Sequence, residues 1–280
     1  MSQIAIIGGS GVYNLSSAKI VEEQEVETPF GKPSSKIKKI DLNGDQFYFL
    51  PRHGEGHYIN PSDVNYRANL YALKSLGVKY ILSISAVGSL KEEYAPNDFV
   101  LVDQFIDWTK GKRARSFFED GVVGHVSVAY PVENALQQRM AEVLKDVDVK
   151  THVNGTYICI EGPQFSSRAE SELYRSFGCD VIGMTNVPES YLAKEAGMAY
   201  ATVAMVTDYD CWKEEHCTLE EIMKVMAKNY DAAQAFVSKI IPSLTKDPVS
   251  FAPENEFAVV TKPELISAKN KEIIEVLTRK

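Results

Sequence analysis

The chain has 280 residues, of which 45% are hydrophobic and 24% are charged, and its formal net charge is -8. This is the composition of an ordinary globular protein that can bury a large core without disulfides or a structural metal. The net negative charge disfavours nucleic acid as the main partner, because phosphate backbones attract clustered Lys and Arg.

The sequence carries no signal for a membrane or for export. No apolar run reaches the roughly 18 to 20 residues that a spanning helix needs, and the start, MSQIAIIGGSG, has no basic region before its apolar stretch. We therefore expect a cytoplasmic protein with no membrane partner. The cysteines lack CxxC or Cys/His spacing, so we expect buried or free thiols at Cys159, Cys179, Cys211 and Cys217.

Apolar runs and helical spacings alternate along most of the chain. In chain order they predict a strand at 3–7, a strand at 46–50, a helix at 62–77, strands at 80–90 and 98–106, a helix at 132–145, a strand at 155–163, a helix at 167–177, a strand at 180–185, a helix at 188–197 and a strand at 199–208. This alternation predicts an α/β fold with a central mixed, largely parallel sheet flanked by helices.

One more helix should follow the last strand. Thr218 with Glu221 three residues later forms a capping-box pattern. One face of that helix would carry Leu219, Ile222, Met223, Met226 and Tyr230. After about Pro242 the composition becomes turn-rich, so we predict one domain over 1–245 and an appended tail over 246–280 that ends in a short helix.

The predicted strands end in small, hydroxylic or charged residues. Such groups are costly to bury unless they are paired, and sites in this architecture lie beyond the carboxyl ends of the strands. We therefore expect one shared site that includes Ser10, Arg52, His53, Ser85, Ala86, Glu161 to Phe165, Met184, Thr185 and Asp208.

Two local motifs have competing interpretations. The GGSG turn at 8–11 is either a simple tight turn or a cradle for one phosphate, and it lacks the full dinucleotide spacing. Arg52 suits a phosphate by its fork geometry. His53 and His57 have the spacing of a helical zinc pair, but Gly54, Gly56 and Pro61 argue against a helix, so we expect no metal.

A basic cluster and an acidic turn also have two interpretations each. We expect Lys110, Lys112, Arg113 and Arg115 to form a solvated loop. Asp208 and Asp210 are either helix caps or a reader of a purine base. As a reader, a protonated Asp donates to a ring nitrogen and a second accepts from an exocyclic amine, which favours 6-aminopurines. Phe165 is either a core aromatic or a base-stacking side chain.

These segments together resemble the trimer-forming purine nucleoside phosphorylase family, and within it the enzymes that cleave methylthioadenosine. The resemblance is carried in order by IAIIGGSGVY, TPFGKPS, PRHG, PSDVNYRAN, SAVGSL, DQFID, IEGPQFSSRAES, MTNVPE, LAKEAG and TDYDCW, over about residues 3 to 240. It implies a nucleoside phosphorylase fold, phosphate as co-substrate and no cofactor.

The resemblance also implies roles for individual residues. Asp208 and Asp210 would read N7 and the 6-amino group, with Asp208 as the general acid. Relatives that take 6-oxopurines tend to have Asn in place of Asp208. The phosphate would lie against Ser10, Arg52, His53, Ser85, Ala86 and Thr185, and the nucleoside against Phe165, Met184, Leu219, Ile222 and His125.

Two of these positions bear on the sugar end and on assembly. Leu219 and Ile222 would form an apolar wall that suits a 5′-thioether and disfavours a 5′-hydroxyl, although such pockets discriminate modestly. His125 resembles a histidine that reaches a neighbouring subunit's site, which implies a homotrimer or a dimer of trimers.

Some positions depart from the family pattern, and other functions stay open. Glu55, Gln164 and Asn186 differ from the residues that relatives often have there. The alternatives to methylthioadenosine phosphorolysis are a phosphorylase for 6-oxopurine nucleosides, a dinucleotide-binding oxidoreductase that uses the GGSG turn, and a nucleoside-binding protein without catalysis.

Overall fold

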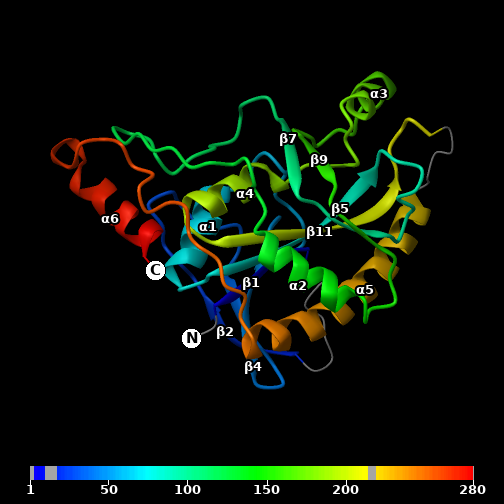
Figure 1. Cartoon of the computed structure of the whole chain (residues 1–280), viewed down its shortest axis with the longest axis horizontal. Coiled ribbons are helices and arrows are strands. Elements are labelled where there is room, and N and C mark those ends of the chain that lie inside the picture. Colours follow the sequence, from blue (N-terminus) through cyan, green and yellow to red (C-terminus); the bar gives the residue numbers. More distant parts are fainter. Residues whose placement is uncertain (1–2, 10–17, 214–218, 280) are drawn as a thin grey trace.

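The computed structural model describes residues 3–9, 18–213 and 219–279, apart from the side chains of Leu219 and Ile222. A twisted sheet forms the centre of the molecule and helices cover both of its faces (Figure 1). Ser10 and the Thr218 end of the predicted capping box lie outside the described residues.

Eleven strands join one mixed sheet in the described part of the chain. They are β1 (Ile4–Gly8), β2 (Ala18–Gln24), β3 (Ile37–Leu42), β4 (Asp45–Pro51), β5 (Tyr80–Ser89), β6 (Phe99–Leu101), β7 (Gln104–Trp108), β8 (Thr151–Val153), β9 (Thr156–Ile160), β10 (Val181–Gly183) and β11 (Ala199–Tyr209). The order is β2-β3-β4-β1-β5-β10-β9-β7, while β11 pairs with β5 and β6, and β6 pairs with β8.

The central pairings are mostly parallel. β1 pairs in parallel with β4 and β5, β5 with β11, and β9 with β7 and β10. All five residues of β1 are buried, as are most of those in β5 and β11. Parallel strands that are covered on both faces have continuous apolar runs in the sequence, and for this reason these strands could be predicted.

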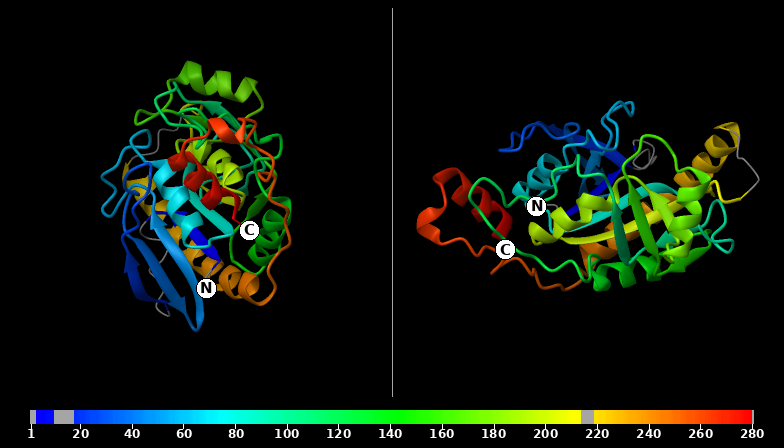
Figure 2. Two further views of the ribbon diagram at one scale, coloured as in Figure 1. Left: turned by 90° about the vertical axis from the view of Figure 1, so that its left-hand side faces the viewer. Right: turned by 90° about the horizontal axis from the view of Figure 1, so that it is seen from above.

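Helices cover the two faces of the sheet unequally. The described helices are α1 (Tyr66–Ser75), α2 (Asn134–Leu144), α3 (Arg168–Ser176), α4 (Asn186–Glu195), α5 (Leu219–Lys246) and α6 (Ala268–Thr278), with a short 3-10 turn at Pro263–Leu265. α2 and α5 pack together on one face, and α1, α4 and α6 lie on the other (Figures 1 and 2). Among the described helices, none is apolar over a stretch long enough to cross a bilayer.

Two predicted helix ends have clear local causes. The side chain of Ser167 accepts a hydrogen bond from the Glu170 backbone N–H, and the Glu170 carboxylate accepts one from the Ser167 backbone N–H, so α3 begins with a complete capping box. α1 begins later than predicted, because Asn65 caps it by accepting from the Ala68 N–H while residues 61–64 form turns.

The sheet contains pairings that the sequence pattern did not reveal. β2, β3 and β8 were not predicted, and β2 is an edge strand whose side chains are mostly exposed. The predicted strand at 98–106 is wrong as a single element. It divides at Asp103 into β6, which pairs with β11 and β8, and β7, which pairs with β9.

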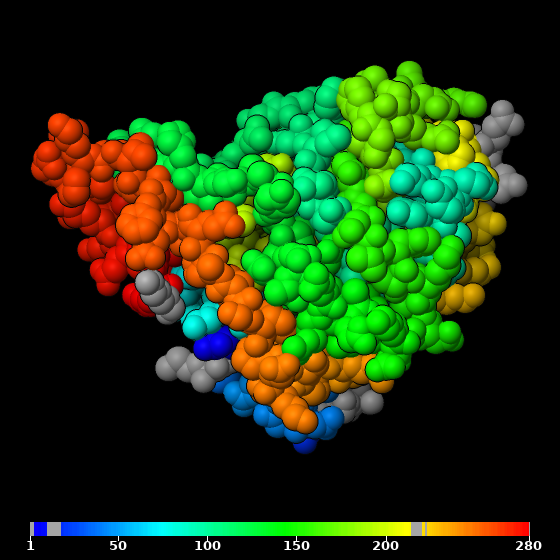
Figure 3. Space-filling model, viewed as in Figure 1, coloured from blue at the N-terminus to red at the C-terminus, as the bar shows by residue number. Residues whose placement is uncertain are grey.

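The C-terminal segment packs onto the same core as the rest of the chain. α5 continues past Pro242 to Lys246, and the following residues run over the surface to α6 (Figure 3). Tyr80 donates a hydrogen bond to the Val249 carbonyl at 2.7 Å. Ile273 and Leu277 of α6 are buried in the hydrophobic core.

Candidate active site

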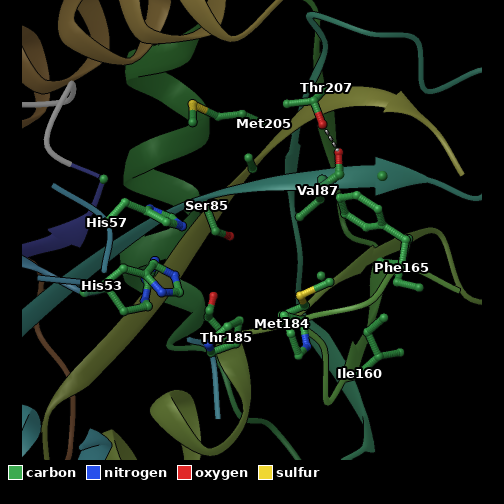
Figure 4. Close-up of a pocket in the computed structure, with 18 of the residues that line it drawn as sticks. His53, His57, Ser85, Val87, Ile160, Phe165, Met184, Thr185, Met205 and Thr207 are labelled. Carbon is green, nitrogen blue, oxygen red and sulfur yellow. Dashed lines mark hydrogen bonds between the residues drawn. The ribbon is translucent and has the colours of Figure 1, made fainter. Parts of the chain in front are cut away.

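A cavity of about 520 Å³ lies where the central strands end, which is within the usual size of small-ligand sites (Figure 4). The predicted residues that line it come from five separate segments. They are Arg52, His53, Ser85, Ala86, Phe165, Met184, Thr185, Asp208 and Asp210. Segments more than 150 residues apart in sequence thus converge on one site, as the polar strand ends predicted.

Arg52 enters the cavity from the end of β4 and is held by Glu189 of α4. Arg52 Nε donates to Glu189 Oε2 at 2.7 Å, and Arg52 Nη2 donates to Glu189 Oε1 at 2.9 Å. Both side chains are almost fully buried. Nη2 also donates to Ser83, whose hydroxyl donates in turn to Glu189. A buried charge is tolerated when it is paired and hydrogen-bonded in this way.

His53 lies beside Arg52 in a glycine-containing turn. Its Nδ1 is 2.8 Å from the Ile59 carbonyl oxygen, and its ring stacks on His57 with centroids 4.4 Å apart. Burial, together with the positive charge of Arg52, lowers the pKa of His53 to about 4. His53 is therefore neutral at pH 7. Within the described residues no cluster of three or more metal-ligating side chains occurs.

Hydroxyl groups complete this end of the cavity. Ser85 from β5 and Thr185 from the start of α4 lie beside His53 (Figure 4). Beneath them Asn186 is fully buried and donates to Tyr200 at 2.6 Å and to Ser83 at 3.0 Å. The family departure at Asn186 therefore supports the floor of the site and does not line it.

The two acidic residues at the end of β11, Asp208 within the strand and Asp210 directly after it, form the opposite end. Burial raises the pKa of Asp208, and the nearby Asp210 carboxylate raises it further, while Thr207 opposes the shift. Thr207 lies 3.1 Å from the Val87 carbonyl and 2.6 Å from Asp208 Oδ1. A hydroxyl carries one hydrogen, so both contacts are hydrogen bonds only if Asp208 is protonated and donates to Thr207.

Asp210 is the more deeply placed of the two carboxyl groups. It is buried, and its Oδ2 has no hydrogen-bond partner in the described chain. Burial raises the pKa of Asp210 as well. A buried oxygen left without a donor is a cost that a ligand N–H can remove.

Apolar side chains form the remaining walls. Phe165 is 83% exposed and still lines the cavity, which is incompatible with the alternative that it is a core aromatic. Met184 lies between Phe165 and Thr185 (Figure 4). Met226 and Tyr230 of α5 also line the cavity. They share the predicted helix face with Leu219 and Ile222, and that shared face is the signal that could have assigned them to the site.

The prediction that the basic cluster forms a solvated loop is wrong for Arg113. It is 5% exposed and is not part of a solvated loop. Its guanidinium donates to the carbonyl oxygens of Met184 and Val187 at 2.7 Å each, to the Glu161 carbonyl at 3.0 Å, and to Glu161 Oε1 at 3.1 Å. Arg113 thus joins the two cavity walls that carry Met184 and Phe165.

The structure leaves several predicted residues away from the cavity. His125 is exposed and its backbone donates to the Ala258 carbonyl, so within one chain it does not line the site. Glu55 is exposed and pairs with Lys38 at 2.7 Å. Gln164 is exposed too. Ser10 and the side chains of Leu219 and Ile222 lie outside the described residues.

Comparison with known proteins places this arrangement in a family. The model of the phosphorylase superfamily matches residues 3–242. The chain belongs to the phosphorylase superfamily. It is 50% identical over 268 residues to S-methyl-5'-thioadenosine phosphorylase of Rhodospirillum rubrum, covering 93% of this chain and 90% of the relative.

Solved structures of the superfamily superpose closely on this chain. A methylthioadenosine phosphorylase from an antarctic soil metagenomic library matches with a TM-score of 0.93 and 44% identity, covering 99% of this chain and 98% of the other. Methylthioadenosine phosphorylase from Schistosoma mansoni, solved with adenine, matches with a TM-score of 0.83 and 36% identity, covering 88% and 93%. The predicted nucleoside phosphorylase fold is confirmed.

Proposed function

We propose that this chain is an enzyme that cleaves 5′-methylthioadenosine with inorganic phosphate, releasing adenine and 5-methylthioribose 1-phosphate. The observation that carries the proposal is the cavity itself, which has a paired acidic turn at one end and an arginine, a histidine and two hydroxyls at the other. The curated relatives that match nearly the whole chain are named for this reaction. Methylthioadenosine phosphorylase from Schistosoma mansoni has been solved with adenine, and a mutant form of the adenosine/methylthioadenosine phosphorylase from that organism with methylthioadenosine.

In this reaction the bond between C1′ and the purine nitrogen breaks before the phosphate bond is complete. The electron pair goes to the purine. A protonated Asp208, whose O–H turns from Thr207 to the ligand, donates a hydrogen bond and then a proton at N7. Asp210 Oδ2, for which the described residues provide no hydrogen-bond donor, accepts from the 6-amino group. Phe165 stacks on the base. This pairing of carboxyl groups favours adenine over 6-oxopurines, which present an acceptor where adenine presents a donor.

The sugar then reacts with phosphate on its other side. Arg52, Ser85, Thr185 and the backbone at Ala86 hold the anion against C1′, with Ser10 as a further predicted contact. Most of the rate gain should come from this positioning and from fixed charge. Met184 packs on the ribose, and Met226 extends the apolar wall predicted from Leu219 and Ile222. A thioether suits such a wall.

We further propose that the enzyme works in the cytoplasm as a homotrimer or a dimer of trimers, without a metal or cofactor. The exposed position of His125 supports a role across a subunit boundary. Analytical ultracentrifugation would measure the assembly. A strictly monomeric enzyme with full activity would exclude a contribution of His125 to a neighbouring site.

The decisive experiment follows base release from methylthioadenosine, adenosine and inosine, each with and without phosphate. We expect phosphate-dependent release of adenine that is fastest from methylthioadenosine. Faster release from inosine would favour the 6-oxopurine alternative. Binding of nucleoside without release would indicate a binding protein, and thermal stabilisation by NAD without nucleoside turnover would favour the oxidoreductase. Asp208→Ala provides the control that removes the proposed acid.

A further inference from the structure

The end of the cavity that is formed by Arg52, His53, Ser85 and Thr185 is called here the oxyanion end. We propose that the positive charge of this end is neutralised before an anion enters, and that the end selects an oxyanion that still carries a proton. Hydrogenphosphate and hydrogenarsenate meet this requirement, and sulfate does not. The inference rests on the proposed function, because it concerns the co-substrate of that reaction. Two observations support it: the ion pair of Arg52 with Glu189, and the hydrogen bond that Nδ1 of His53 donates to the Ile59 carbonyl.

The positive charge at this end is already compensated. Glu189 accepts two hydrogen bonds from Arg52, one from Ser83 at 2.9 Å and one from Tyr200 at 3.0 Å, and it is fully buried. Arg52 is the sole Lys or Arg among the described residues that line the cavity, and the stretches 10–17 and 214–218 contain neither residue type. Net charge therefore attracts an anion weakly here, and hydrogen-bond matching decides which anion binds.

The hydrogen bond at His53 fixes which ring nitrogen carries a hydrogen. The Ile59 carbonyl oxygen can only accept, so Nδ1 of His53, 2.8 Å away, is the donor. A second proton on the ring is disfavoured by burial, by Arg52 and by the stacked His57. In the neutral ring Nε2 therefore presents a lone pair among the side chains at this end of the cavity (Figure 4).

A lone pair distinguishes two anions of the same shape and charge. Hydrogenphosphate and sulfate are both tetrahedral dianions, but only hydrogenphosphate has an O–H that can donate to Nε2. Sulfate would place an acceptor against an acceptor. The remaining donors treat both anions alike, since Nη1 of Arg52 has a second hydrogen beyond its 3.3 Å bond to the Ile84 carbonyl, and the hydroxyls rotate.

The same lone pair faces the proton that the reaction releases. When the phosphate oxygen bonds to C1′, the phosphate group of the product loses the proton that hydrogenphosphate carried. Nε2 of His53 accepts a hydrogen bond from that O–H, and the proton itself passes to solvent, because burial and Arg52 disfavour a second proton on the ring. Asp208 supplies the proton that adenine takes up and is itself reprotonated from solvent, so one proton is consumed and one is released.

The test measures anion preference in the unaltered enzyme. Adenine release from methylthioadenosine gives the KM for phosphate, the ability of arsenate to replace phosphate, and the inhibition constant of sulfate against phosphate. We expect arsenate to support turnover and sulfate to bind about tenfold or more weakly than phosphate. Equal affinity for sulfate and phosphate would overturn the inference and leave the proposed function standing. No turnover with either phosphate or arsenate would defeat the proposed function instead.

Variants assign the preference to one residue. His53→Leu removes the lone pair, so phosphate should bind more weakly while sulfate does not, and the preference for phosphate should fall toward one. Thr185→Val removes a hydroxyl that donates to either anion, so it should weaken both and leave the preference unchanged. Thermal stabilisation by each anion, measured without nucleoside, gives the same ratio independently of turnover. A full preference that persists in His53→Leu would refute the role of His53.

Discussion

Replacing Arg113 by methionine should damage both stability and catalysis, because one buried guanidinium joins the two walls of the cavity. The substitution keeps much of the aliphatic stem and removes every donor. It leaves the carbonyl oxygens of Met184, Val187 and Glu161 without the bonds that Arg113 makes. It also leaves the Glu161 carboxylate, whose side chain is 14% exposed, without its cation.

The magnitude follows from the burial of these groups. Breaking a buried ion pair from one side typically lowers the free energy of unfolding by about 3–5 kcal/mol. Glu161 is partly exposed and keeps a hydrogen bond from the Lys110 backbone, so we expect the free energy of unfolding to fall by about 3 kcal/mol, the lower end of that range. A displacement of Met184 or of the Phe165 wall by about 1 Å would lower kcat/KM by about 100-fold.

Urea unfolding and steady-state kinetics measure the two effects separately. Lys112→Met is the matched control, since Lys112 is adjacent, is 63% exposed and pairs with the exposed Asp63. That pair is exposed to solvent and screened, so Lys112→Met should leave the free energy of unfolding nearly unchanged. Arg113→Lys retains the charge without the fork and should be intermediate in kcat/KM. The reasoning fails if Arg113→Met and Lys112→Met unfold and react alike.

Three further predictions concern the two ends of the cavity. Asp210→Asn removes a negative charge that raises the pKa of Asp208, so the alkaline limb of the kcat/KM profile should move to lower pH, and an unmoved limb would contradict Asp208 as the acid. Because burial and Arg52 lower the pKa of His53 from 6.5 to about 4, the free energy of unfolding should fall as the pH drops from 6.5 toward 4. His53→Gln should lose that part of the fall in urea titrations, and identical pH curves would refute it. Phe165→Ala should change the free energy of unfolding by no more than about 0.5 kcal/mol, because Phe165 is 83% exposed, yet raise the nucleoside KM about tenfold or more through lost stacking, as initial rates would show.

The sequence determined much of the fold because the central strands are covered on both faces. Buried parallel strands such as β1 and β11 require unbroken apolar runs, and such runs are visible without coordinates. The polar residues that end those runs marked the site, because polar groups next to buried strands need partners. Arg52, Thr185 and Asp208 were found in this way.

Only the tertiary structure decided which charges are buried and which are solvated. Arg113 and Lys112 are neighbours in sequence, yet one is buried beneath the cavity walls and the other faces solvent. Glu189 pairs with Arg52 from 137 positions away along the chain. Local spacing carries no information about such pairs, because they are made by strands and helices that meet only after the sheet has formed. The division of the 98–106 segment into β6 and β7, which pair with different strands, was hidden for the same reason.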